Sequence, residues 1–395
     1  MDSPVLWLRI DPEMTLLREV ILEQPDYQWT YQLRYERDVI AQMESLAVLD
    51  RFNTKQARDA LLEVITSEAT FYRVRCQATT CLRRVANLMG ASWIGPPALL
   101  PQFRKLFGSP SCPNIVRMNN FSHFQHYFLQ MAIFRAVAGL RTLHGICPAE
   151  VLRFLFDLFK YNDNSKNAFT DAYYRAALVD ALAETVTPVA IAPIFNAVTG
   201  AATAAPVVDM LSPDTKSILE EITRSFNLDK LLPCYQNVVT VSCLRAIRHL
   251  QRMGHLPSSG AIFRAHTSHN CYVAVRKAAI EILVDIVRAE GRKEDLDFLL
   301  DDLVVGDPQP VIKFYTLKYL IKNPPFSFLS EEQCPLDTEE LVEKLWALMN
   351  GGTFATDSRL RCAVVDLYYV LYGRGRPRCL PKPEVSDLGE GMFFQ

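Results

Sequence analysis

The stretch Val275-Arg-Lys-Ala-Ala-Ile-Glu-Ile-Leu283 decides the fold class of this 395-residue chain. Val275, Ala279 and Leu283 are spaced four residues apart, which places them on one face of an α-helix. The small Ala279 lets a neighbouring helix approach, and the basic Arg276 flanks the apolar face. The pattern therefore predicts an amphipathic helix that packs against other helices.

The same pattern recurs at five other places along the chain. Its first members there are Val74, Tyr174, Val239, Ile312 and Leu360. From Val239 through Val275 to Leu360 the successive spacings are 36, 37 and 48 residues, close to the ~40–47 residues of two-helix HEAT or armadillo units. Such units stack because none can bury its apolar face alone. We predict an all-α, HEAT/armadillo-like α-solenoid; the alternative is a set of unrelated amphipathic helices.

A short β-type segment precedes the helices. Residues 5–10 and 16–22 have the composition of strands, and Asp11-Pro12 turns the chain between them. Two strands alone are not stable, so we expect them to be a short β remnant of a larger sheet. The predicted domains are residues 1–24 as the end of a β-domain, 25–373 as the helical repeat domain with a loop near 185–213, and 374–395 as a flexible tail.

The composition is that of a folded chain with reduced thiols. Hydrophobic residues make up 49% and charged residues 22%, which provides enough apolar surface for a core. The ten cysteines form no Cys-x-x-Cys pair, so we expect buried thiols of an intracellular protein. The longest uncharged run, 185–208, contains three prolines, and we therefore expect no membrane span.

Sequence motifs for catalysis are absent. The chain has no His-Glu-x-x-His, no Gly-x-Ser-x-Gly and no Gly-x-x-x-x-Gly-Lys-Ser/Thr. His123-x-x-His126 and His266-x-x-His269 have a spacing that metal ligands use, but neither is followed by a second pair at defined spacing. We expect no enzyme, no metal, no cofactor and no small-molecule substrate.

Charge is distributed unevenly along the chain. Residues 69–149 carry nine bases and no acid, whereas residues 1–50 carry ten acids against four bases and residues 285–307 eight acids against three bases. A cluster of one sign favours an anionic partner. The candidate nucleic-acid contacts in the basic block are Arg73, Arg75, Arg83, Arg84, Arg104, Lys105 and Arg117.

Three interpretations of these bases stay open: contact with nucleic-acid phosphates, contact with an acidic protein, or a solvated helix face. Aromatic residues are interleaved with the bases, and Phe121, Phe124 and Phe128 have the spacing of a helix face that we expect in the core. A second, weaker basic stripe consists of Arg245, Arg248 and Arg252.

Specific strings along the chain resemble a known family. They include Leu6-Trp-Leu-Arg-Ile-Asp-Pro-Glu-Met-Thr15, Tyr31-Gln-Leu-Arg-Tyr-Glu-Arg-Asp-Val39, Phe71-Tyr-Arg-Val-Arg75 and Val239-Thr-Val-Ser-Cys-Leu-Arg-Ala-Ile-Arg248. They are similar to the family of transcription initiation factor TFIID subunit 2, a TATA-binding-protein-associated factor, from residue 4 to about residue 381.

The resemblance implies an aminopeptidase-like architecture of β-domains, a thermolysin-like domain and a HEAT-like helical region. Residues 1–24 would then end an aminopeptidase-like β-domain, with the rest of the protein upstream. The zinc motif of the family is generally degenerate, which implies a nuclear, non-catalytic scaffold whose partners are other TFIID subunits and core promoter DNA. Two alternatives stay open: the helical C-terminal domain of an active zinc aminopeptidase, and a solenoid adaptor with no nucleic-acid role.

Overall fold

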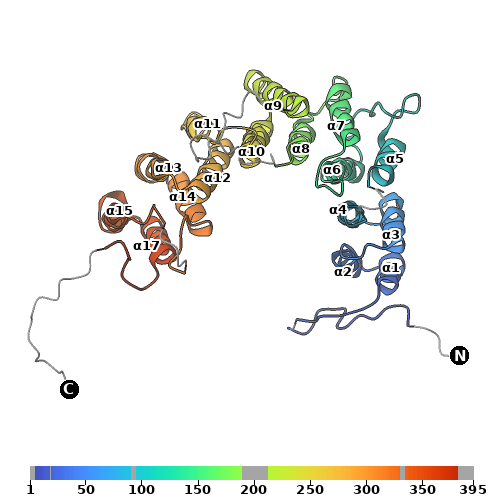
Figure 1. The fold of residues 1–395 in the computed structure, drawn as a ribbon, viewed down its shortest axis with the longest axis horizontal. Coiled ribbons are helices and arrows are strands. Elements are labelled where there is room, and N and C mark those ends of the chain that lie inside the picture. Colours follow the sequence, from blue (N-terminus) through green and yellow to red (C-terminus); the bar gives the residue numbers. More distant parts are fainter. Residues whose placement is uncertain (1–4, 18, 90–94, 189–211, 330–333, 381–395) are drawn as a thin grey trace, which may run out of the picture. The chain divides into compact units, whose positions relative to one another are not determined.

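The computed structural model describes residues 5–17, 19–89, 95–188, 212–329 and 334–380. Within these ranges the chain is helical and forms no strand beyond an isolated bridge between Gly108 and Val116 (Figure 1). It divides into two compact units, residues 1–258 and 259–395. The all-α prediction is confirmed, and each unit is a stack of helices.

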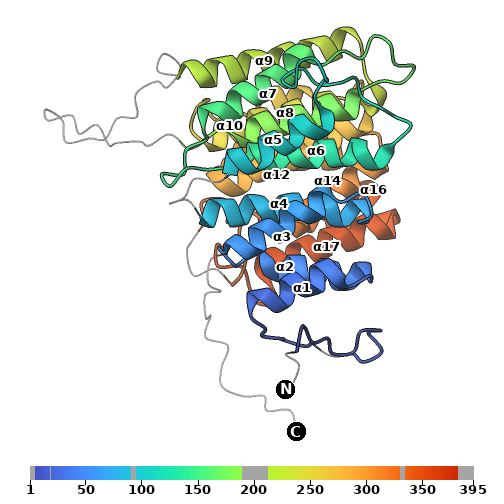
Figure 2. The same cartoon turned by 90° about the vertical axis from the view of Figure 1, so that its right-hand side faces the viewer.

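The first unit is a stack of paired helices in two layers. The even-numbered helices α2 to α10 pack against one another in chain order, and each odd-numbered helix packs against the even-numbered helix that follows it (Figures 1 and 2). The helices are α1 (Asp26–Tyr35), α2 (Val39–Leu49), α3 (Lys55–Thr66), α4 (Tyr72–Leu88), α5 (Gly95–Phe107), α6 (Phe124–Ala138), α7 (Ala149–Tyr161), α8 (Ala172–Glu184), α9 (Pro213–Leu231), the 3₁₀ turn η3 (Tyr235–Asn237) and α10 (Val238–Arg252).

The second unit is arranged similarly but begins with a helix of only five residues. Its inner layer consists of α12, α14 and α17, which pack against one another in that order. The helices are α11 (Ala261–Ala265), α12 (Val273–Glu290), α13 (Lys293–Phe298), the π-helical continuation η4 (Leu299–Val305), α14 (Pro310–Lys322), α15 (Glu339–Asn350), α16 (Gly352–Thr356) and α17 (Ser358–Tyr372).

The predicted repeat is confirmed by where its members lie. All six occurrences fall in inner-layer helices: α4, α8, α10, α12, α14 and α17. The middle residue of each pattern packs against the neighbouring helix, and Ala78, Cys243 and Ala279 are each 0% exposed. A small or compact side chain at this position allows the close helix approach that the spacing predicted.

Three of the five basic residues of the repeat have a structural role that the sequence did not reveal. Arg75 donates from Nε to the Ile65 carbonyl at the end of α3 (3.0 Å), and Arg276 donates from Nε to the Thr267 carbonyl after α11 (2.7 Å). Lys313 donates from Nζ to the Val305 carbonyl at the end of η4 (2.7 Å). Each of the three bases therefore binds a carbonyl at or just beyond the end of the preceding helix and ties the pair together.

The N-terminal segment does not form the predicted strands. In residues 5–17 and 19–25 the backbone has no ladder partner, which agrees with the instability of an isolated strand pair. The segment is tied to α2 by Arg9, whose guanidinium lies 3.0 Å from Asp38 and 3.6 Å from Glu44. Most of the predicted loop near 185–213 and most of the predicted tail from 374 lie outside the described residues.

Candidate functional site

Three of the seven predicted DNA-contacting bases are buried or form ion pairs within the first unit. Arg75 is 2% exposed and serves as a helix cap, so it cannot reach a phosphate on the surface. Arg83 pairs with Glu184 at 3.0 Å, and Arg84 pairs with Asp50. Carboxylates distant in sequence therefore neutralise part of the predicted basic block, although the Arg84 side chain stays exposed.

The other four predicted bases could bind an anionic partner. Arg73, Lys105 and Arg117 are exposed and Arg104 is half-buried. Among the residues that the structure describes, none of the four has a carboxylate partner. We call these four side chains the unpaired bases.

The second predicted stripe is divided between surface and interior. Arg245 and Arg252 are exposed on α10, whereas Arg248 is 6% exposed and donates to the Ser258 hydroxyl at 3.3 Å. Arg248 therefore belongs to the interior of the first unit. A basic spacing of three and four residues marks a helix face but does not distinguish a solvated face from a half-buried one.

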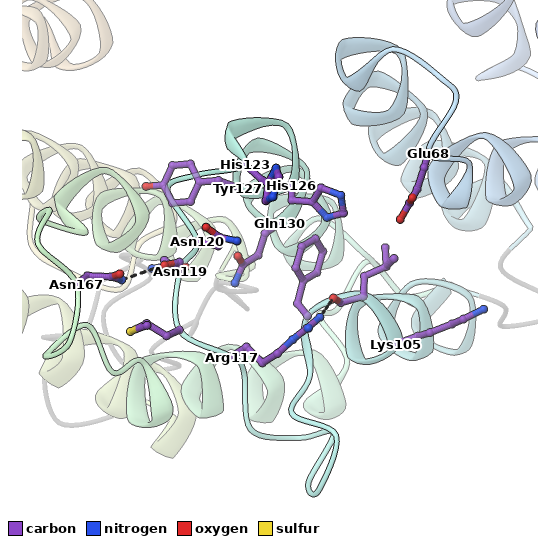
Figure 3. Close-up of a pocket in the computed structure, with 13 residues that line it drawn as sticks. Glu68, Lys105, Arg117, Asn119, Asn120, His123, His126, Tyr127, Gln130 and Asn167 are labelled. Carbon is purple, nitrogen blue, oxygen red and sulfur yellow. Dashed lines mark hydrogen bonds between the residues drawn. The ribbon is translucent and has the colours of Figure 1, made fainter.

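Two of the unpaired bases line a pocket of about 750 Å³ in the first unit (Figure 3). Lys105 comes from the end of α5, and Arg117 comes from the loop that follows. Arg117 donates to the Leu106 carbonyl, and its own backbone N–H bonds the Phe107 carbonyl at 2.9 Å. A Cβ at Gly108 would lie 2.4 Å from the Arg104 carbonyl oxygen, so the loop can fold back this tightly only with glycine there.

Amide and imidazole groups form much of the remaining polar wall of the pocket (Figure 3). Asn119 is 3% exposed, and its Nδ2 has no hydrogen-bond partner. Gln130 donates to the Tyr174 hydroxyl at 3.3 Å, and Asn167 donates to the Asn119 carbonyl at 2.9 Å. A buried donor without a partner costs free energy, and Asn119 is one of the residues that line this pocket. The remaining polar lining is Glu68, Asn120, His123, His126 and Tyr127.

The prediction that Phe124 and Phe128 belong to the core is wrong. They are 57% and 41% exposed, because α6 packs through its other face, with Leu129 and Phe134 at 0% exposure. The ring of Phe128 stacks on Tyr72 of α4 at 5.8 Å and on Phe124 at 6.3 Å. An exposed aromatic surface therefore lies on the helix that supplies His126 and Gln130 to the pocket.

Nearly the whole chain matches proteins of one family. A family model described as "TAF2-like, TPR repeats" matches residues 26–391. The chain is 53% identical to transcription initiation factor TFIID subunit 2 of Drosophila melanogaster over 97% of its length, and 50% identical to the proteins of the same name from Gallus gallus and Danio rerio over 98%. The chain belongs to the TFIID subunit 2 family. The resemblance predicted from the sequence strings is confirmed.

The chain spans about a third of the length of these members of the TFIID subunit 2 family, with coverage of 30%, 32% and 31%. The family description names TPR repeats, whereas the sequence spacing favoured HEAT or armadillo units. All three are stacks of helical units whose exposed faces are extended binding surfaces.

Three thiols of this family member, Cys81, Cys147 and Cys243, are buried and used for packing, whereas Cys362 is exposed, so the prediction of buried thiols is confirmed only in part. Burial raises the pKa of Cys81 and of Cys243 to about 12, so neither is a thiolate at neutral pH. In the described ranges no three His, Cys, Asp or Glu side chains are grouped as a metal site requires. No helix in those ranges is long and apolar enough to cross a bilayer.

Proposed function

We propose that the chain is a non-catalytic scaffold segment of a TFIID subunit and holds other TFIID subunits in a nuclear initiation complex. The match to relatives named TFIID subunit 2 over 97–98% of the chain carries this proposal. The pocket supports it further, because a partly enclosed site with an unpaired donor and a basic rim suits a segment of another protein. Recovery of TFIID subunits with the tagged chain tests the proposal.

Contact with core promoter DNA is the second candidate function, and the unpaired bases favour it. Arg73, Arg104, Lys105 and Arg117 come from a stretch of 81 residues without an acid, and they have no carboxylate partner in the described part of the chain. Such side chains neutralise phosphates and release counterions on binding.

If the four unpaired bases contact duplex DNA, the logarithm of affinity should fall with the logarithm of salt concentration at a slope of about −3.6. Replacing Arg73 and Arg104 by glutamine should make the slope less negative by about 2, because two phosphate contacts are lost. Fluorescence anisotropy on a labelled promoter duplex measures both. A slope near zero, or one that the double variant leaves unchanged, would rule out DNA contact through these bases.

A further inference from the structure

We propose that the pocket lined by Lys105, Arg117 and Asn119 binds an acidic, extended segment of a partner protein. The inference rests on the proposed scaffold function and names the chemistry of the partner. The pocket's volume of about 750 Å³ lies within the range of cavities that enclose a small ligand or a few side chains.

The charged residues at the pocket favour an occupant with negative charge. Lys105 and Arg117 are exposed at its wall without a carboxylate partner in the ranges described, and Glu68 is the single acid that lines it (Figure 3). An aspartate or glutamate side chain would be attracted to Arg117, and Lys105, which points away from the cavity in Figure 3, adds positive charge at the rim. Pairs of this kind are strengthened where protein walls exclude water.

The amides that line the pocket are compatible with a polypeptide as the occupant. The buried Nδ2 of Asn119 lacks a hydrogen-bond acceptor, and Asn120, Gln130 and Asn167 line the same cavity. Neutral amides pair with the alternating N–H and C=O groups of an extended backbone. A hydrogen bond from Asn119 Nδ2 to the bound segment would remove the free-energy cost of a buried unpaired donor. This gain would add to the affinity.

Two features disfavour nucleic acid as the occupant. A duplex presents its phosphates on a rod that is too wide to enter this pocket. The exposed rings of Phe124 and Phe128 already stack on one another and on Tyr72. They offer an apolar contact beside the pocket, which suits a protein segment that carries an apolar side chain next to its acid.

The test uses the full chain and a fluorescein-labelled peptide with the sequence Gly-Asp-Asp-Phe-Asp-Leu-Asp-Gly. We expect saturable binding in fluorescence anisotropy that weakens at least tenfold in the double variant K105E/R117E. Both side chains are exposed, so the variant should keep its fold, which circular dichroism verifies. The matched control is Arg153→Glu, because Arg153 is an exposed base of α7 in the same unit and outside the pocket.

Asn119→Leu provides an independent readout. It removes the buried donor without changing charge, and we expect it to weaken peptide binding severalfold while the salt dependence stays the same. A duplex of equal charge and inorganic phosphate serve as competing probes. Displacement of the peptide by either probe at equal concentration would overturn the proposal, since the site would then recognise phosphate.

Absence of peptide binding, or equal losses in K105E/R117E and R153E, would also overturn the proposal. A chain that binds the peptide through the pocket but recovers no TFIID subunit would leave the pocket assignment intact and contradict the proposed scaffold function instead. The two failures are therefore distinguishable.

Discussion

Replacement of Arg276 by methionine is expected to lower the free energy of unfolding of the second unit by about 3–5 kcal/mol. The Arg276 and Asp307 side chains are 1% and 5% exposed and form an ion pair. Arg276 also donates to the Gln309 side-chain oxygen at 3.0 Å and to the Thr267 carbonyl at 2.7 Å. The substitution leaves the Asp307 carboxylate buried without its partner. Urea denaturation measures the loss, and hydrogen exchange of α12 and α14 amides locates it.

Arg361→Met is the matched control, because Arg361 occupies the same repeat position on α17 but is exposed. Its expected effect is within about 0.5 kcal/mol. The double variant R276M/D307L should recover much of the stability, since an apolar pair can replace a buried ion pair. If R276M costs no more than R361M, the capping role of the repeat base is wrong.

Replacement of Asp229 by asparagine is expected to cost the first unit about 3 kcal/mol at neutral pH. Asp229 is 0% exposed on α9 and accepts the backbone N–H groups of Cys234 (3.0 Å) and Thr240 (3.1 Å), together with the Thr240 hydroxyl. Asn237, at the start of α10, provides no side-chain cap. The carboxylate of the preceding helix therefore caps α10 in its place.

The loss in free energy of unfolding caused by Asp229→Asn should be smaller at low pH. Burial opposes ionisation of Asp229, but the hydrogen bonds from Cys234 and Thr240 outweigh it and lower its pKa. The stabilisation is therefore fully present above the unfolded-state pKa of about 4 and is lost as pH falls through the lower folded-state pKa.

Urea midpoints at pH 7 and pH 3 measure this dependence. Glu220→Gln, on the exposed surface of α9, serves as the control with little change at either pH. A cost for Asp229→Asn that is equal at both pH values would contradict the ionised capping role.

The fold could be predicted because its periodicity is local. Apolar residues four apart place Val275, Ala279 and Leu283 on one helix face, and all three are at most 4% exposed. The strands expected at 5–10 and 16–22 could not be judged from their composition, because a strand depends on partners that local sequence does not contain.

The candidate site could be predicted only in part, because charge along a sequence does not determine where a side chain points. Glu184 is 101 residues from Arg83 and still neutralises it. One signal was available for Arg75: it occupies the same repeat position as Arg276 and Lys313, and a base that recurs with the repeat indicates a structural role. Such a role follows from the repeat itself.

The pocket was beyond sequence reasoning because four separate segments form its wall. Glu68 precedes α4, Lys105 ends α5, Gln130 lies in α6, and Asn167 precedes α8. The Asn119-Asn120 pair within the basic block was the one local signal. An amide pair in a loop is common, and only packing reveals that one donor is buried and unpaired.

The most direct test of the account is the recovery of TFIID subunits on the tagged full chain from nuclear extract, measured by quantitative mass spectrometry. We expect the unaltered chain and R153E to recover TFIID subunits equally, and K105E/R117E to recover at least fivefold less. Recovery of no TFIID subunit by the unaltered chain would contradict the scaffold function. Equal recovery by K105E/R117E would contradict the pocket as its docking site.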